Sequence, residues 1–262
     1  TKLSFRTGAS EAAAEKMALN NEGDLKIVTD GASIFFGADS EIELRHVADD
    51  GLILKHVGTG DGKEPSLTFQ AGDTDIAADD VLGSIFFQAP DEGAGTDAIL
   101  VAAGIEAVSE GDFAADNNAT KLSFKTGASE AATEKMSISS AGNVTMKNTA
   151  TGDDTPMTLT LQTGETDIAA SDKIGVINFQ APDEGTGTDA ILVAAGIEAV
   201  SEGDFSSSSN ATKLSFKTGA SEAAAEKMAL SSAGALTVTG DITAYSSDER
   251  LKDLEGTIPS AL

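Results

Sequence analysis

The sequence predicts an all-β protein built from tandem units of about 92 residues, and three features of the chain predict this fold class. Residues 67–113 return at 159–205 with scattered changes, and residues 120–136 return at 212–228 at the same 92-residue offset. Apolar and polar residues alternate along short runs that end at glycine-rich turns. Aromatic residues are only 5% of the chain and Trp is absent, which leaves little bulk for a globular core. We therefore expect an elongated chain that buries its apolar surface against copies of itself.

The repeats divide the chain into five predicted parts. These are the end of a truncated repeat at 1–27, a divergent β-hairpin insert at 28–66, β-repeat 1 at 67–158, β-repeat 2 at 159–246, and the start of a further, truncated domain at 247–262. The chain begins inside a repeat and without Met, so we expect it to be a piece cut from a longer protein.

The stretch GASEAAAEKM at 8–17, which returns with small changes at 127–136 and 219–228, has high helix propensity. The middle copy carries Thr133 and is followed by Ile138, and β-branched residues disfavour a helix without breaking the repeat. We predict a hairpin in which KLSFKT is the first strand, GASEAA the turn and EKMALS or EKMSIS the return strand. The turn SAG and a short strand, NVTM or ALTV, follow. The alternative is a helix confined to SEAAAEK, although seven residues are marginal for a helix.

Two further strands are predicted from the comparison of the repeats. GSIFFQ and GVINFQ differ at alternate positions, where Ser84 and Phe86 become Val176 and Asn178. Such alternation is typical of a strand with one packed face, so we expect Leu122, Phe124, Ile177 and Phe179 to be buried. The apolar run AILVAAGIEAVSEG, cut by Gly, predicts a strand at a crowded interface.

The insert predicts another hairpin, and the acidic turns predict solvated loops. SEIELRHVADDGLILKHVG alternates on both sides of DDG, with His46 and His56 on the apolar faces. APDEGAGTD and APDEGTGTD are turns by their Pro, Asp and Gly content. The acidic residues of these turns are Asp91, Glu92 and Asp97, repeated as Asp183, Glu184 and Asp189. They could instead bind Ca²⁺ through their carboxylate oxygens.

The charge of the chain excludes some partners. With 17 basic and 43 acidic residues the net charge is −26, which argues against nucleic acid and against anionic membranes. The absence of Cys fits folding in a reducing cytosol, and no apolar run is long enough to cross a membrane. The two histidines could meet their symmetry mates and hold a metal, but packing or turn capping is the preferred interpretation. No carboxylate pair is marked as suited to glycoside hydrolysis, and we expect no cofactor and no metal.

Residues 212–262 carry a resemblance to a known family. The run KLSFKTG, EAAAEKMALSSAGALTVTGDITAY and SSDERLK resembles the distal shaft of bacteriophage tail fibres and tailspikes. The element SSDERLKD at 246–253 resembles the opening of the endosialidase-type intramolecular chaperone domain, the S74 peptidase family, found at the C-terminus of many such fibres. Family membership implies an intertwined homotrimeric β-fibre. It also implies a chaperone domain that promotes trimerisation and then cuts itself off.

The resemblance also implies site residues for that cleavage. The Ser of the family's Ser-Asp-x-Arg-x-Lys element is the nucleophile, and a Lys five residues further on is its base; these positions are Ser247 and Lys252. A Ser hydroxyl becomes nucleophilic when a neighbouring base takes its proton. The bond implied to break is Ser246–Ser247, in the full-length protein only, so we expect no enzyme activity of this chain itself.

The function expected is that of a structural and adhesive shaft of a phage tail fibre, which projects receptor-binding regions toward the host cell. Its expected partners are further copies of itself, other tail proteins and a glycan or protein receptor on the host. The expected location is the virion tail, outside the cell, after assembly in the bacterial cytoplasm. The alternatives are a bacterial trimeric surface adhesin and a tailspike that degrades polysaccharide.

Overall fold

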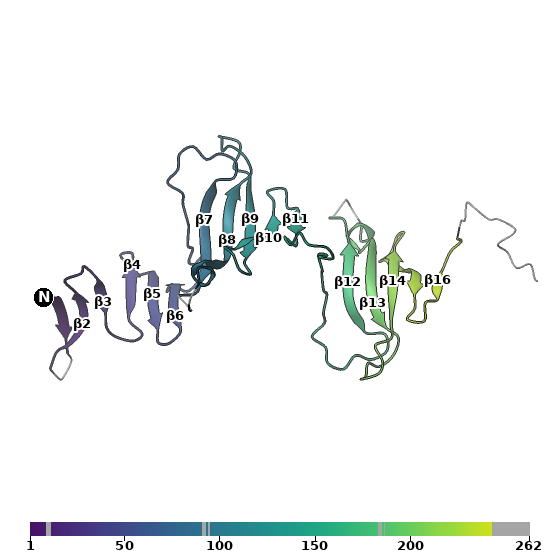
Figure 1. The fold of residues 1–262 in the computed structure, drawn as a ribbon, viewed down its shortest axis with the longest axis horizontal. Coiled ribbons are helices and arrows are strands. Elements are labelled where there is room, and N and C mark those ends of the chain that lie inside the picture. Colours follow the sequence, from purple (N-terminus) through teal and green to yellow (C-terminus); the bar gives the residue numbers. More distant parts are fainter. Residues whose placement is uncertain (9–11, 91–92, 94, 183–184, 186, 243–262) are drawn as a thin grey trace, which may run out of the picture. The chain divides into compact units, whose positions relative to one another are not determined.

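The structure, a computed structural model, describes residues 1–8, 12–90, 93, 95–182, 185 and 187–242. These residues form four antiparallel β-sheets and two short 3₁₀ turns, with no α-helix among them (Figure 1). The all-β fold class is therefore confirmed. The chain divides into two compact units, Thr1–Thr155 and Pro156–Leu262, each of which is described by itself.

The first unit begins with two three-stranded sheets. One has the strand order β1–β2–β3 and the other β4–β5–β6. Their bounds are β1 Leu3–Thr7, β2 Ala14–Leu19, β3 Leu25–Ile27, β4 Ser33–Phe36, β5 Ile42–Val47 and β6 Gly51–His56. The hairpin predicted in the insert is confirmed, since β5 and β6 pair around Asp49 and Asp50 with Leu44 opposite Leu54.

A five-stranded sheet completes the first unit, and a second five-stranded sheet forms the other unit. The first has the order β11–β10–β9–β8–β7, with β7 Val81–Gln88, β8 Val101–Ser109, β9 Thr120–Thr126, β10 Thr133–Ile138 and β11 Val144–Met146. The second has the order β12–β13–β14–β15–β16, with β12 Lys173–Phe179, β13 Ala195–Ser201, β14 Thr212–Thr218, β15 Ala225–Leu230 and β16 Leu236–Val238. Short 3₁₀ turns, η1 Asp97–Ile99 and η2 Asp189–Ile191, precede β8 and β13.

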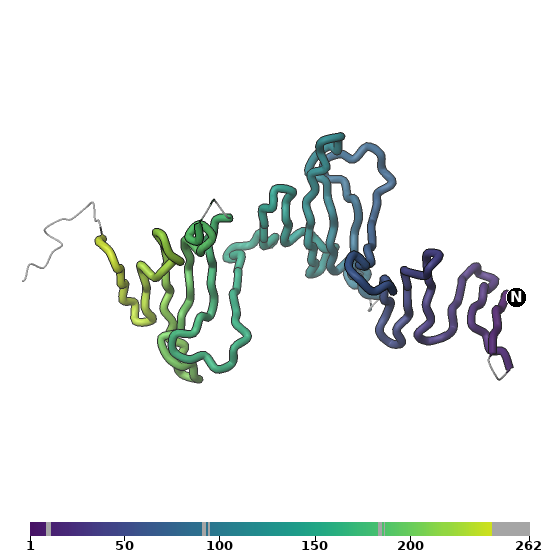
Figure 2. Tube along the Cα trace, turned by 180° about the vertical axis from the view of Figure 1, so that it is seen from behind, coloured from purple at the N-terminus to yellow at the C-terminus, as the bar shows by residue number. Residues whose placement is uncertain are grey.

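Strand pairing in the two five-stranded sheets corresponds at an offset of 92 residues. Ile105 lies opposite Phe124 in the first sheet, and Ile197 lies opposite Phe216 in the second. The trace in Figure 2 follows the same meander in both, strand after neighbouring strand. Such a meander needs only short turns, and Gly142 and Gly234 supply them with φ of 81° and 80°, a region that favours glycine.

The GASEAAAEKM stretches form hairpins, as predicted, and the helix alternative is wrong for the copies that the structure describes. In the middle copy β10 begins at Thr133, and in the last copy β15 begins at Ala225. The amide of Gly127 bonds the carbonyl of Ala102, so the turn is tied to the neighbouring strand. In the first copy β2 begins at Ala14, while residues 9–11 lie outside the described residues.

A β-bulge in each hairpin changes which face a side chain takes. In β10, Glu134 lies opposite Lys125 and Met136 lies opposite Phe124, so the pairing shifts between them. Residues that lie opposite one another share a face of the sheet. The bulge at Lys135 therefore places Glu134 on one face and Met136 on the other, although they are two residues apart.

The apolar side chains that the sequence predicts to be buried are not fully covered within the single chain, and their burial against other copies stays a prediction. Leu122, Ile177 and Phe179 are 39%, 42% and 54% exposed, and Phe124 is half-buried. The physical reason is that each five-stranded sheet is a single layer, and no second layer of the same unit covers its apolar face. The fully buried side chains among the described residues are polar instead, namely Ser109, Ser123 and Ser215.

Candidate functional site

The most prominent surface feature is the apolar face of each five-stranded sheet. In the first sheet, one row of opposed residues crosses all five strands; it consists of Ile85, Ile105, Phe124, Met136 and Met146. The next row consists of Ala107, Leu122, Ile138 and Val144. In the second sheet the two rows are Ile177, Ile197, Phe216, Met228 and Val238, and Ala199, Leu214, Leu230 and Leu236. We call these two sets the apolar faces.

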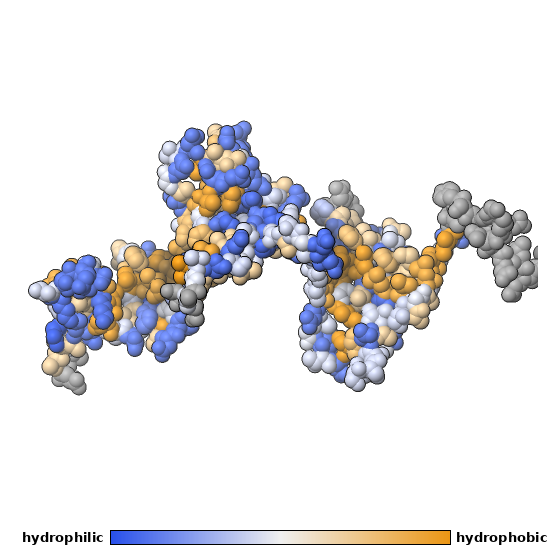
Figure 3. Space-filling view, in the orientation of Figure 1, coloured by the Kyte–Doolittle hydropathy of each residue, from blue (hydrophilic) through white to orange (hydrophobic). Residues whose placement is uncertain are grey.

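None of the residues on the apolar faces is buried in the single chain. Ile85, Val144 and Leu236 are 45%, 55% and 58% exposed. Figure 3 shows apolar residues gathered over the β12–β16 sheet. A contiguous apolar surface that spans five strands is far more than the scattered exposed residues of an ordinary monomer. Such a surface is typical of an interface with another polypeptide.

The two small sheets follow the same arrangement. In the β1–β3 sheet, Phe5, Met17 and Ile27 lie opposite one another. In the β4–β6 sheet, Leu44 lies between Ile34 and Leu54. Leu25 of the first of these sheets is 60% exposed and Leu52 of the second is 70% exposed. Each of the four sheets thus has an apolar face that is partly exposed in the described part of the chain.

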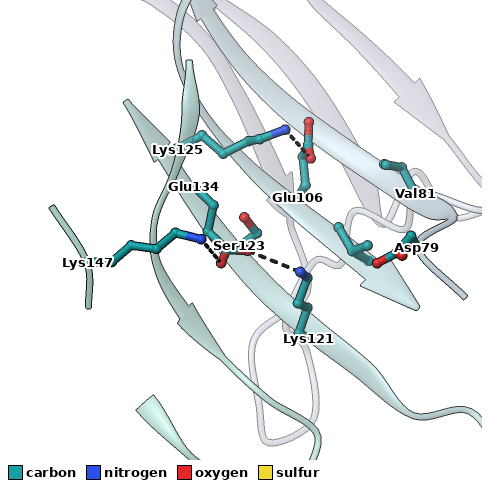
Figure 4. A pocket seen from close by; sticks show the side chains of 9 residues that line it. Asp79, Val81, Glu106, Lys121, Ser123, Lys125, Glu134 and Lys147 are labelled. Atoms are coloured by element: carbon teal, nitrogen blue, oxygen red, sulfur yellow. Dashed lines mark hydrogen bonds and ion pairs between the residues drawn. The ribbon is translucent and has the colours of Figure 1, made fainter. Parts of the chain in front are cut away.

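The opposite face of each sheet is polar and is covered by the chain's own side chains. Glu106 is only 6% exposed because Ser84 and Ser123 lie opposite it and Lys125 reaches across it, with its Nζ 2.7 Å from the carboxylate. Glu134 bonds Lys121 at 3.3 Å and Lys147 at 3.2 Å. These groups line an open hollow of about 340 Å³ (Figure 4). Since every lysine in it is paired with a glutamate, the hollow offers no free cation to an anionic ligand.

The second sheet carries the same polar cluster with one lysine moved. Glu198 bonds both Lys173, at 2.8 Å, and Lys217, at 2.9 Å, while Glu226 bonds Lys213 at 2.7 Å. Lys173 occupies the position of Val81 in the first sheet, and Thr239 occupies the position of Lys147. Each cluster therefore has three lysines and two glutamates, but the third lysine comes from the β12 edge in one sheet and follows β11 in the other.

The lysines hold the glutamates in their charged form. Burial raises the pKa of Glu198, but hydrogen bonds from Lys173 and Lys217 outweigh this effect, so the pKa lies below its ordinary value. The same balance lowers the pKa of Glu134, through bonds from Ser123, Lys147 and Lys121. The Lys213 ammonium and the Ser215 hydroxyl lower the pKa of Glu226. Glu134, Glu198 and Glu226 therefore stay ionised at neutral pH.

Buried serines anchor the loops that precede each sheet. Ser109 is fully buried; its hydroxyl donates to the carbonyl of Ala77 and accepts from the amide of Asp80 at 3.0 Å. Ser201 does the same in the second sheet, with Ala169 and Asp172. These bonds fix the ends of β7 and β12 without covering the apolar faces.

The site residues predicted from the sequence fall in different places. Ser246, Ser247 and Lys252 lie outside the described residues, so self-cleavage stays a prediction. The same is true of the acidic turn residues Asp91, Glu92, Asp183 and Glu184. Asp97 and Asp189 are described and begin the 3₁₀ turns η1 and η2.

The histidines have structural partners. His56 accepts a hydrogen bond from the amide of Gly58 at 3.0 Å, which is the turn capping expected from the sequence. His46 lies 3.8 Å from Asp30. Among the described residues, no three His, Asp or Glu side chains are grouped so that they could hold a metal ion. No helix in the described ranges has the length and apolar character needed to cross a membrane.

Solved structures that are similar to this chain include domains of a phage tail fibre. The carboxy-terminal domain of the bacteriophage T5 L-shaped tail fibre matches over 78% of this chain and 99% of its own, with 12% identity and a TM-score of 0.32. The same domain with its intramolecular chaperone domain matches over 87% of this chain and 69% of its own, with 12% identity and a TM-score of 0.31. No protein-family model matches the sequence, and no curated protein does.

Sequence reasoning missed the polar face. The residues Glu106, Ser123 and Glu198 are among the most buried side chains, yet as polar residues on alternating strands they suggest solvent exposure. One available signal was that the first Glu of AGIEAVSEG, Glu106 or Glu198, is the same in both repeats, as are the lysines of KLSFKT. A further signal was that each repeat has one more lysine, but at a different position. Repeat 1 has it at position 147, where repeat 2 has Thr239, and repeat 2 has it at position 173, where repeat 1 has Val81.

Proposed function

We propose that this chain is a structural and adhesive shaft segment of a phage tail fibre, and that it works as a homotrimer. In this assembly the apolar faces of three copies pack against one another, and the polar faces are turned to solvent. The observation that carries the proposal is the exposed apolar row that crosses every strand of each sheet, such as Ile177, Ile197, Phe216, Met228 and Val238.

Self-association is supported by the pattern of the apolar surface. The apolar faces repeat at an offset of 92 residues, so a partner must offer two complementary surfaces at the same spacing. A second copy of this chain carries the same two apolar faces, so it offers such a pair of surfaces. The trimeric number and the tail-fibre role rest on the sequence resemblance of residues 212–262, which implies a homotrimer.

The mechanism proposed is mechanical. A single-layer sheet that becomes the wall of a closed homo-oligomer is rigid, because every apolar face is then packed and the wall has few free edges. A shaft of such units holds receptor-binding regions away from the virion, and three binding regions on one shaft bind more tightly than one. The partners proposed are copies of itself, other tail proteins and a surface receptor of the host, and no catalysis is required.

The test is the solution mass of the chain, measured by multi-angle light scattering. We expect a mass near three times 26.5 kDa. A folded monomer at micromolar concentration would contradict the proposal. A dimer or tetramer would keep the self-assembled shaft and overturn the trimer.

A further inference from the structure

Two segments of the chain have the sequence of β-strands but no strand partner in the structure. They are residues 66–70, SLTFQ, and residues 158–162, TLTLQ, which correspond at the 92-residue offset. In both, apolar residues alternate with Thr, as in a strand with one buried face. We call them the unpaired segments.

The backbone of the unpaired segments makes no hydrogen bond with any described residue of the chain. Their apolar side chains are uncovered: Leu67 is 70% exposed, Leu159 60% and Leu161 45%. Figure 1 draws the segment that leads into β12 as a loop without a strand arrow. A run of free main-chain amides and carbonyls beside apolar side chains is a ready template for strand pairing.

Each unpaired segment lies at the same end of its sheet. Leu159 and Leu161 line a hollow together with Ile174 and Ile177 of β12, and the hollow extends over the apolar face to Ile197, Ala199 and Leu214. A Cβ on Gly175 would come within 3.2 Å of Leu161, and a Cβ on Gly83 within 2.7 Å of Phe69. The segments therefore lie beside β12 and β7, while β16 and β11 form the opposite edges of the two sheets.

We propose that each unpaired segment pairs with the outer edge of β16 or β11 in a neighbouring copy, Thr160 beside Thr237 and Thr68 beside Thr145. This strand pairing rests on the proposed self-assembly and specifies which backbone segments of two copies would be hydrogen-bonded. In a cyclic oligomer, one edge of each copy contacts a different edge of the next copy. The segment and β16 meet this requirement, because they lie at opposite ends of the sheet.

The residue patterns of the two partners match. β16 reads Leu-Thr-Val and β11 reads Val-Thr-Met, each with a central Thr between apolar residues. The segments read Leu-Thr-Leu and Leu-Thr-Phe at their centres. Paired in this register, the apolar residues extend the apolar face and the threonines extend the polar face. The three-residue edges of β11 and β16 also match the short length of the segments.

A cysteine pair tests this contact, because the chain has no Cys of its own. The strands β12 and β16 are four strand spacings apart, roughly 19 Å, so in the variant Thr160→Cys/Thr237→Cys the two cysteines of one chain lie at opposite ends of the sheet. A disulfide requires Cα atoms within about 7 Å, so this bond can form only between chains. After oxidation with diamide, we expect covalent dimers and trimers on a non-reducing denaturing gel, and their loss on reduction.

Two control variants make the outcome decisive. Thr160→Cys/Thr145→Cys pairs the segment with the edge of the other unit, and we expect no multimers from it. If this variant cross-links and Thr160→Cys/Thr237→Cys does not, the assigned edge is wrong. If neither cross-links while light scattering gives a trimer, the inference fails and the proposed function stands. A monomer by light scattering overturns both.

Hydrogen exchange of the unaltered chain provides a second measurement that needs no variant. In the assembled protein we expect amides 158–162 to exchange about 100-fold more slowly than those of the exposed loop 60–64. Equal exchange rates would show that the segment is unpaired in the assembly, and would overturn the inference.

Discussion

The two faces of the β12–β16 sheet are filled in opposite ways. On the polar face, Glu198 and Ser215 are 6% and 1% exposed, covered by lysines of the same chain. On the apolar face, Leu214 and Leu236 are 39% and 58% exposed, and no second sheet among the described residues of the unit covers them. A folded domain normally buries its apolar side first, because apolar burial is the main favourable term in folding. Under the proposed self-assembly, the chain completes its own polar face and leaves the apolar face to be covered by other copies.

The largest effect is expected from a charge on the apolar face. Ile197→Asp together with Ile105→Asp would place unpaired carboxylates inside the proposed interface, which costs several kcal/mol per buried charge. We expect the light-scattering mass to fall to that of a monomer. As a control, Asn178→Asp adds a similar charge to the exposed polar side of β12, and we expect it to keep the trimer. A trimer that survives both Ile changes would contradict the role of the apolar face.

The next effect concerns the serines that anchor the loops. Ser109→Ala removes the acceptor of the Asp80 amide and a donor to Ala77 in a fully buried position. We expect a loss of about 1–3 kcal/mol in the free energy of unfolding, measured with urea. Ser201→Ala is the matched variant in the second sheet and should lose a similar amount. The exposed Ser207→Ala should change it by less than about 0.5 kcal/mol. Equal effects at all three sites would show that the buried bonds do not matter.

The pH dependence follows from the glutamates of the polar face. The pKa values of Glu134, Glu198 and Glu226 are lowered in the folded chain from an ordinary value of 4.5. The unfolded chain then binds protons at a higher pH than the folded chain, so the stabilisation is present above pH 4.5 and is lost as the pH falls below it. We expect the urea midpoint to fall between pH 6 and pH 3.5, and to fall less in Glu134→Gln/Glu198→Gln. An identical pH profile in that variant would contradict the assignment.

The smallest effect concerns the lysine that changes position between the sheets. Lys147 and Lys173 are about half exposed, so each ion pair contributes about 0.5 kcal/mol or less. We expect Lys147→Thr to destabilise the first sheet slightly and Val81→Lys/Lys147→Thr to restore it, since the new lysine can reach Glu106 as Lys173 reaches Glu198. A double variant that is less stable than Lys147→Thr would show that the two positions are not equivalent.

The hairpins could be predicted from the sequence because alternation and turn residues are local signals. Thr133 and Ile138 favour a strand over a helix, and the SAG turns precede the short strands β11 and β16. The buried face could not be predicted in this way. Alternation shows that Leu122 and Phe124 share a side, but a single-layer sheet has no inner side until another layer covers it.

The polar cluster was also beyond the local signals. The bulge at Lys135 breaks the period of two, so periodicity places Glu134 on the wrong face. The unpaired segments follow an ordinary strand pattern, and only the structure shows that they have no strand partner among the described residues. In both cases the deciding feature is how one strand is placed against another, and sequence spacing alone does not determine this.

The moved lysine has a consequence for how such a gene changes length. Residues 98–113 and 190–205 are identical, and they lie between the two positions at which the lysine differs. Unequal recombination within this stretch would delete one unit and leave a hybrid repeat that contains both Val81 and Thr239. Its polar cluster would hold two lysines and two glutamates. The reciprocal product would contain a hybrid repeat with both Lys173 and Lys147, whose cluster would hold four lysines. Shortening of the array would thus leave a hybrid repeat with one lysine fewer than usual, and lengthening would leave one with one lysine more. The number of lysines in a repeat could therefore reveal past events in related genes.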